Sequence, residues 1–163
     1  MNASQTMAGR QFIAGRRVAS GEATLLSLRA VDGEATGHRF YPASREEAAQ
    51  AAEAAQQAFA VYSQTTPQQR ARFLCAIADE LDALGEAFFA LAEQETALPL
   101  ARLQGERART SGQLRMFAGV IQRGDTFAAR IDTALADRQP LPRPDLRQYQ
   151  QALGPVAVFG ASN

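Results

Sequence analysis

The sequence contains no lysine, because all seventeen of its basic residues are arginine. Without a lysine amine, this segment cannot supply Schiff-base catalysis, an amine nucleophile or the lysine of a phosphate-binding P-loop. Cysteine is scarce too: Cys75 stands alone, so no internal disulfide can form, which fits a reducing cytoplasm. The single histidine, His38, has no second histidine or cysteine at metal-ligand spacing. We therefore expect His38 at the surface and no metal site.

The chain also lacks net charge and long apolar runs. Seventeen acidic residues balance the basic ones, so no overall field attracts nucleic acid or an anionic membrane. No apolar run of about 18 residues could span a bilayer, and residues 1–10 are too polar for a signal peptide. With 46% hydrophobic and 21% charged residues, the composition is that of a globular domain. We expect a soluble, cytoplasmic protein with no nucleic-acid or membrane partner.

Helix-starting signals dominate the middle of the chain. Ser44 and Glu47 have capping-box spacing, and Ala48, Ala51, Ala52, Ala55 and Phe59 then form one apolar stripe. Thr66, Pro67 and Gln69 start a second helix in the same way, with the stripe Phe73, Leu74, Ile77, Ala78, Leu81 and Leu84. Cys75 lies on this stripe, so we expect a small buried side chain without a catalytic role.

Breaks in the pattern predict two further helices. Gly85 stops or kinks the second stripe, and a third apolar segment continues to Thr96. Pro99 can open a fourth helix, which ends at Gly124. Its predicted buried stripe consists of Thr110, Leu114, Phe117 and Ile121. Its arginines alternate with Glu106 and glutamines and lack an aromatic platform, so nucleic-acid binding is not expected.

Short strands are predicted on both sides of the helices. Residues 11–17 and 24–31 read as strands, with turns at Gly15, Gly21 and Gly33. Residues 125–151 contain three prolines in their middle, which exclude a central strand but suit the loop of a long hairpin.

The last twelve residues predict the site. Residues 156–159 are apolar and follow a Gly-Pro break, as in a strand buried on both faces of a parallel sheet. Ligands bind at the carboxyl ends of such strands, which here means residues 160–163. A parallel strand needs neighbours joined by long crossovers, and none follows. We therefore expect a fragment cut at the first strand of a larger domain.

Three stretches resemble the aldehyde dehydrogenase superfamily. The chain opens with a Phe-Ile-x-Gly strand like that of the family, and residues 152–163 are similar to its Leu-Gly-Pro-Val run with a loop ending in Asn. The family commonly has Pro-Trp before that Asn, where Ala161 and Ser162 stand here. Residues 95–118 contain Glu-Thr-Ala-Leu-Pro in place of the usual Glu-Thr-Gly-Lys-Pro. The Arg-Leu-x-Gly-Glu and Gln-Leu-Arg runs that follow resemble the branch that oxidises α-ketoglutarate semialdehyde (2,5-dioxovalerate).

The resemblance implies an α/β fold, the N-terminal part of the aldehyde dehydrogenase fold. Residues 1–124 would hold the short N-terminal strands and the four-helix segment of the cofactor-binding domain. Residues 125–151 would form an oligomerisation hairpin, and residues 152–163 the first strand and loop of a truncated Rossmann-like domain. The full-length protein would be an NAD(P)-dependent enzyme and a homo-oligomer.

The same resemblance implies the site residues. The Asn163 amide would stabilise the oxyanion formed when a cysteine thiolate adds to the aldehyde, and Phe159, Gly160, Ala161 and Ser162 would contact NADP or NAD. The sequence has no Gly-x-Gly-x-x-Gly fingerprint to support the cofactor independently. The family's nucleophilic cysteine and its glutamate base have no counterpart in these residues, so the chain alone should be inactive.

One reading of another class stays open on the residues alone. A non-catalytic helical module could oligomerise or bind a partner by pairing its final apolar strand with a partner strand.

Overall fold

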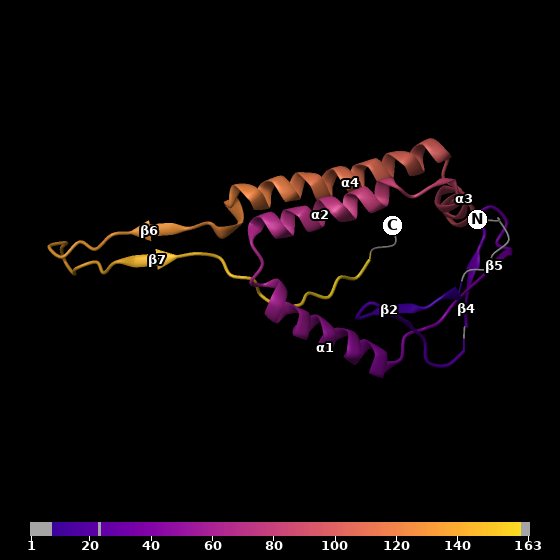
Figure 1. Cartoon of the computed structure of the whole chain (residues 1–163), viewed down its shortest axis with the longest axis horizontal. Helices are drawn as coiled ribbons and strands as arrows, with labels where there is room; N and C mark the ends of the chain where they lie inside the picture. The colour runs from indigo at the N-terminus through magenta and orange to yellow at the C-terminus, as the bar shows by residue number, and fades with distance from the viewer. Residues whose placement is uncertain (1–7, 23, 161–163) are drawn as a thin grey trace.

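The computed structural model describes residues 8–22 and 24–160 of the chain. Short N-terminal strands lead into four α-helices, a long two-stranded arm and a final extended segment (Figure 1). The arm projects from one end of the helical part, and the N-terminal strands lie at the other end. The expected mixture of small sheets with a four-helix segment is confirmed.

Five short strands open the described chain: β1 (Ala8–Gly9), β2 (Gln11–Ile13), β3 (Arg16–Val18), β4 (Leu25–Leu28) and β5 (Ala35–Phe40). β2 and β3 form an antiparallel hairpin, and β5 lies between β1 and β4 in a three-stranded sheet. The hairpin turns at Gly15, which has a φ of 77°, a value that glycine adopts without steric cost. The predicted turn at Gly33 also has positive φ, 74°.

The sequence reading missed β5. Its composition, Ala-Thr-Gly-His-Arg-Phe, contains a glycine and few apolar residues. Pairing with β1 and β4 defines the strand, and its exposed and half-buried positions alternate, with Thr36, His38 and Phe40 on the half-buried face. His38 is therefore partly covered, not fully at the surface as expected.

Both predicted capping boxes are present. In α1 (Arg45–Tyr62), the Ser44 hydroxyl accepts from the Glu47 N–H at 3.1 Å, and the Glu47 carboxylate accepts from the Ser44 N–H at 2.9 Å. In α2 (Pro67–Asp82), Thr66 and Gln69 make the same reciprocal pair. Each box satisfies two backbone donors that have no partner inside the helix.

The other two helices begin and end where glycine and proline predicted. α3 (Glu86–Thr96) starts after Gly85, and α4 (Leu100–Arg123) starts after Pro99. α3 ends at Ala97 and α4 at Gly124, both in the left-handed conformation, with φ of 55° and 79°. This conformation turns the chain out of the helix and is commonest for glycine.

The pair formed by α2 and α4 is the best-packed part of the described chain (Figure 1). Ala71 and Ala78 on α2 and Ser111 and Ala118 on α4 are buried. Small side chains at these positions let the two helices approach closely. Hydrophobic burial here stabilises the fold, although no large side chain is fully buried among the described residues.

The predicted face of α4 is partly wrong. Leu114 and Ile121 are half-buried as expected, but Thr110 and Phe117 are exposed. The face toward α2 is centred on Ser111 and Ala118, because small residues give a closer contact than the apolar pattern suggested. A stripe of hydrophobic residues locates a helix but does not fix which side its partner takes.

The alanine stripe of α1 is not packed in this structure. Ala48, Ala51, Ala52 and Ala55 are exposed, and only Phe59 of the predicted stripe is half-buried. α1 contacts β2 and stands apart from the α2–α4 pair (Figure 1). The expectation that this helix packs closely through its alanines is therefore not met by the described residues.

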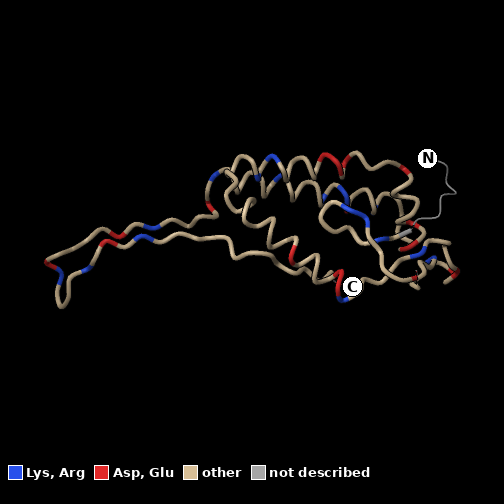
Figure 2. Tube along the Cα trace, turned by 60° about the horizontal axis from the view of Figure 1, so that its bottom comes forward, with Lys and Arg blue, Asp and Glu red and all other residues tan. Residues whose placement is uncertain are grey.

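The arm has the predicted hairpin form. After a short 3₁₀ turn (Asp125–Phe127), β6 (Arg130–Asp132) pairs antiparallel with β7 (Leu146–Gln148). Farther out, Leu135 bridges Arg143, whose guanidinium donates to the Thr133 carbonyl at 2.9 Å. At the base, the Gln150 N–H donates to the Phe127 carbonyl at 2.8 Å. Charges of both signs alternate along the arm (Figure 2).

The expected strand at residues 156–159 is not formed. Residues 149–160 have no regular secondary structure, and Leu153 is 96% and Phe159 93% exposed. A buried strand takes its hydrogen bonds from its neighbours, and no described strand lies alongside this segment. The apolar sequence therefore stays extended and uncovered.

Candidate functional site

The predicted site is at the C-terminal end of the chain. Of its five residues, the structure describes Phe159 and Gly160, whereas Ala161, Ser162 and Asn163 lie outside the described residues. Phe159 is almost fully exposed, and a Cβ added at Gly160 would meet no atom within 4 Å. These two residues therefore do not by themselves form a cradle that fits a dinucleotide.

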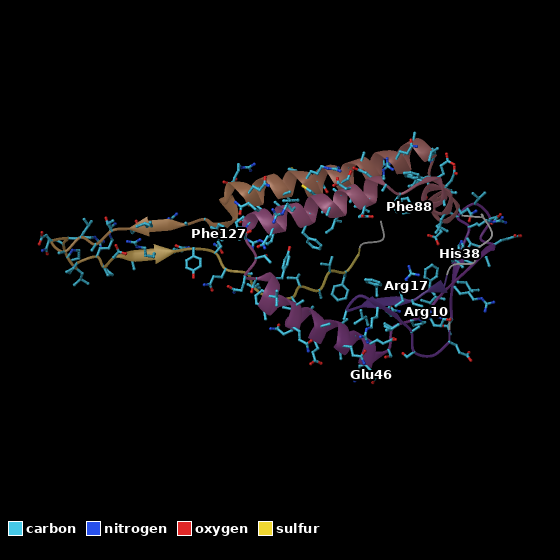
Figure 3. The ribbon with its side chains drawn as sticks, in the orientation of Figure 1. Arg10, Arg17, His38, Glu46, Phe88 and Phe127 are labelled. Atoms are coloured by element: carbon cyan, nitrogen blue, oxygen red, sulfur yellow. The ribbon has the colours of Figure 1, made fainter. Side chains whose placement is uncertain are left out.

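Charged side chains lie among the N-terminal strands, where Figure 3 labels Arg10, between β1 and β2, and Arg17 on β3. The Arg10 guanidinium lies 5.9 Å from the centre of the Tyr41 ring, and the Gln11 side chain donates to the Tyr41 carbonyl at 2.5 Å. These contacts hold β2 beside the approach to α1. No group of three or more histidine, cysteine or acidic side chains suited to a metal ion occurs in residues 8–22 and 24–160.

Arg107 is the most interconnected polar side chain of the helical part. It comes from α4 and donates to the carbonyls of Asp82 and Leu84, each at 3.2 Å, at the C-terminal end of α2. Its guanidinium also lies 5.1 Å from the centre of the buried Phe89 ring. The Arg107 Nε is 3.9 Å from the Asp82 carboxylate, too far for a hydrogen bond, and has no other partner. Arg107 thus joins α2, α3 and α4 at one point.

Arg115 makes the second connection between α2 and α4. Its guanidinium contacts Asp82 at 2.8 Å and Asp79 at 2.7 Å. The Ser111 hydroxyl and the Arg115 guanidinium hold the pKa of Asp82 below its usual value. The sequence reading treated these arginines only as part of an interleaved basic helix. The Asp79 and Asp82 pair, three residues apart on one face of α2, was the signal that could have shown their partners.

Cys75 is half-buried on α2, so the expectation of a covered side chain is met only in part. Among the described residues, Cys75 makes no hydrogen bond to a histidine or a carboxylate. A nucleophilic thiol needs a nearby base or cation.

No described helix is long and apolar enough to cross a membrane.

The aldehyde dehydrogenase family model matches residues 19–160, most of the chain. The chain belongs to the aldehyde dehydrogenase family. This membership confirms the resemblance found in the sequence, and it favours the enzyme reading over the non-catalytic module.

Two curated relatives show the branch. The chain is 56% identical over 155 residues to the alpha-ketoglutaric semialdehyde dehydrogenase of Acinetobacter baylyi. The aligned region covers 95% of this chain and 30% of that protein. It is 47% identical over 158 residues to alpha-ketoglutaric semialdehyde dehydrogenase 2 of Azospirillum brasilense. That aligned region covers 96% of this chain and 30% of that protein. The chain therefore spans about 30% of the length of these relatives.

Solved structures support the fold. A point mutant of betaine aldehyde dehydrogenase from Staphylococcus aureus, in complex with NAD+, superposes with a TM-score of 0.70 at 24% identity, covering 84% of this chain and 28% of that one. A putative aldehyde dehydrogenase from Burkholderia cenocepacia gives a TM-score of 0.67 at 26% identity, covering 78% and 26%. The described helices and strands thus have the arrangement of the same region of dehydrogenases.

Proposed function

We propose that this chain forms part of an NAD(P)-dependent aldehyde dehydrogenase that oxidises α-ketoglutarate semialdehyde to α-ketoglutarate. The observation that carries the proposal is the 56% identity over 155 residues to a relative of that activity. The second relative, at 47% identity, carries the same activity in its name. The proposed substrate is thus a small aldehyde. The cytoplasm is the proposed location, because a chain with a single cysteine fits a reducing compartment.

Asn163 is proposed as a catalytic residue of the assembled enzyme. When a thiolate adds to an aldehyde, the carbonyl oxygen becomes an oxyanion, and an amide N–H aimed at that oxygen stabilises the transition state by roughly 3 kcal/mol. The Asn163 amide would be such a donor, because Asn163 stands at the position of the Asn that closes the family's motif. Support comes from the matching family motif in residues 152–163.

NAD or NADP is proposed as the cofactor, with Phe159, Gly160, Ala161 and Ser162 as contacts. Family membership supports this proposal. The exposed Phe159 and the open space around Gly160 do not form a binding site in the described chain. Cofactor contact would therefore require neighbouring strands beside residues 156–160.

The arm at residues 125–151 is proposed to mediate assembly into a homo-oligomer. An isolated two-stranded hairpin is marginal in water. Ile131, Leu141 and Tyr149 are exposed along this arm, which gives a partner apolar surface to cover.

A chimera tests the proposed activity. This chain replaces the matching 30% of the Acinetobacter baylyi relative, and the purified chimera is assayed with α-ketoglutarate semialdehyde and with betaine aldehyde. We expect reduction of NAD+ or NADP+ with the first substrate and a much lower kcat/KM with the second. A folded chimera that prefers betaine aldehyde, or oxidises neither, would contradict the proposed substrate.

The isolated chain is expected to be inactive with either cofactor, since Cys75 is half-buried and has no activating hydrogen-bond partner among the described residues. The measurement is the oxidation rate of the semialdehyde by purified 1–163 beside its Cys75→Ser variant. Turnover that disappears in Cys75→Ser would make Cys75 the nucleophile.

A further inference from the structure

The two strands of the arm pair only with each other among the described residues. Each strand therefore keeps one free edge, whose backbone N–H and C=O groups can pair with another strand. Pro144 stands just before β7 and cannot donate a ladder hydrogen bond, whereas residues 128–135 contain no proline or glycine. The edge of β6 is thus the more open of the two.

The charges of the two strands differ in the same sense. On β7, Arg147 and Asp145 form an ion pair with each other, with Nε and Oδ1 2.7 Å apart. On β6, Arg130 and Asp132 have no ion pair or side-chain hydrogen bond with any described residue. Ile131, which lies between them, is 60% exposed. β6 therefore presents a cation, an exposed apolar side chain and an anion in a row.

This order of side chains is complementary to itself in an antiparallel pair. When β6 lies beside β6 of a second copy with the two Ile131 residues opposite each other, Arg130 of each copy faces Asp132 of the other. A twofold axis at the centre of the pair relates the two contacts, as in an isologous interface. The flanking residues 128, 129, 133 and 134 are alanine or threonine, so bulky side chains do not obstruct the approach.

The same charges disfavour the neighbouring registers. A shift of two residues keeps each side chain on its own face of the sheet, and brings Arg130 opposite Arg130 or Asp132 opposite Asp132. Like charges directly opposite each other are destabilising. The charge pattern of β6 therefore selects one register over its neighbours.

We propose that the partner of the β6 edge is β6 of a second copy of this chain, in the register that places the two Ile131 residues opposite each other. The pair joins two arms into one four-stranded antiparallel sheet, in the order β7-β6-β6-β7. A sheet of three or more strands is more stable in water than an isolated hairpin. The inference rests on the proposed homo-oligomer, and adds to it the edge, the register and the residues of the contact.

The test reverses one charge at a time in the chimera with the Acinetobacter baylyi relative. Arg130→Asp brings carboxylates face to face across the pair, and Asp132→Arg brings guanidinium groups face to face. Each variant should weaken the association of the arms by at least about tenfold, because two attractive contacts become repulsive. Sedimentation equilibrium measures the association, and circular dichroism verifies the fold of each variant.

Mixing the two variants is the decisive step. In a mixed pair, positions 130 and 132 are both acidic in one chain and both basic in the other, so both contacts are attractive again. With different tags on the two variants, we expect mixed oligomers to copurify and to associate as strongly as the unmodified chimera. A role of Arg130 and Asp132 inside a single chain cannot produce this rescue, because each chain keeps its own altered charge.

Two further sets of variants serve as controls. Arg147→Asp and Asp145→Arg make the same charge changes on β7, and should leave the association unchanged, singly and mixed. Ile131→Asp puts two carboxylates at the centre of the pair, so it should weaken the association, and mixing with either β6 charge variant should not restore it fully.

Three results would overturn the pairing: β6 charge variants that associate like the unmodified chimera, a mixture without rescue, or rescue by the β7 variants instead. With any of these, an oligomeric chimera leaves the proposed homo-oligomer standing. A monomeric unmodified chimera would overturn the homo-oligomer and the pairing together. The semialdehyde assay reports on the proposed substrate separately from all of these outcomes.

Discussion

At the scale of single residues, Asn163 carries the sharpest prediction. In the chimera, Asn163→Ala should lower kcat by about 10²- to 10³-fold with little change in cofactor affinity, because the amide acts on charge that develops in the transition state. Steady-state kinetics and cofactor titration measure the two quantities. An unchanged kcat would remove Asn163 from the mechanism.

Arg107 is the structural residue with the clearest test. One guanidinium nitrogen, Nη1, donates to both carbonyls while the planar group lies near the Phe89 ring, and lysine keeps the charge but has no planar group to make that ring contact. Arg107→Lys in the chimera should therefore lower the free energy of unfolding by about 1–3 kcal/mol. Urea denaturation measures this change.

Arg109→Lys is the matched control. Arg109 is exposed, and its Nη1 makes a long ion pair of 3.7 Å with the Glu106 carboxylate. Exposed pairs of this kind contribute about 0–1 kcal/mol. Equal destabilisation by the two substitutions would show that Arg107 is not a special contact.

At the scale of elements, the contact between α2 and α4 should respond to pH. The pKa of Asp82 is lowered in the folded chain by the Ser111 hydroxyl and by Arg115. A lowered folded pKa means that the stabilisation is fully present above the unfolded value of about 3.9, and is lost as pH falls toward the lower folded value.

The measurement is the urea midpoint of the chimera and of its Asp82→Asn variant between neutral pH and pH 3. Asp82→Asn should be less stable at neutral pH, and the difference should shrink below about pH 4. A difference that is independent of pH would assign the loss to packing instead of charge.

Element boundaries were largely predictable because their signals are local. The starts of α1 and α2 are marked by the capping boxes of Ser44 with Glu47 and of Thr66 with Gln69. The end of α4 is marked by Gly124, which adopts positive φ without steric cost. β5 was missed because its strand pattern depends on pairing with β1 and β4, not on its own composition. The face of α4 was misjudged because the position of α2 decides it.

At the scale of the whole molecule, the uncovered apolar surface of the α1 alanine stripe, Phe73 and residues 153–159 predicts how the isolated chain behaves. Exposed apolar surface is worth about 25 cal/mol per Å² to any association that covers it, so several hundred Å² exceed the stability of a small domain. Purified 1–163 should elute as oligomers or aggregate, and should bind a hydrophobic dye.

Deletion of residues 152–163 should reduce both effects, since it removes Leu153, Val158 and Phe159 from the surface. Size-exclusion chromatography and dye fluorescence compare the two chains. A monodisperse, cooperatively melting 1–163 whose stability ignores the deletion would contradict this account.

The sequence by itself determined the helices, their caps, the arm and the family, because these follow from local spacing and from motifs that extend along the chain. Tertiary structure alone decided which faces are covered. α4 met α2 through Ser111 and Ala118, whereas the α1 stripe and residues 153–159 found no partner among the described residues. Burial and strand pairing need a second surface in the right place, and an apolar pattern cannot supply that surface by itself.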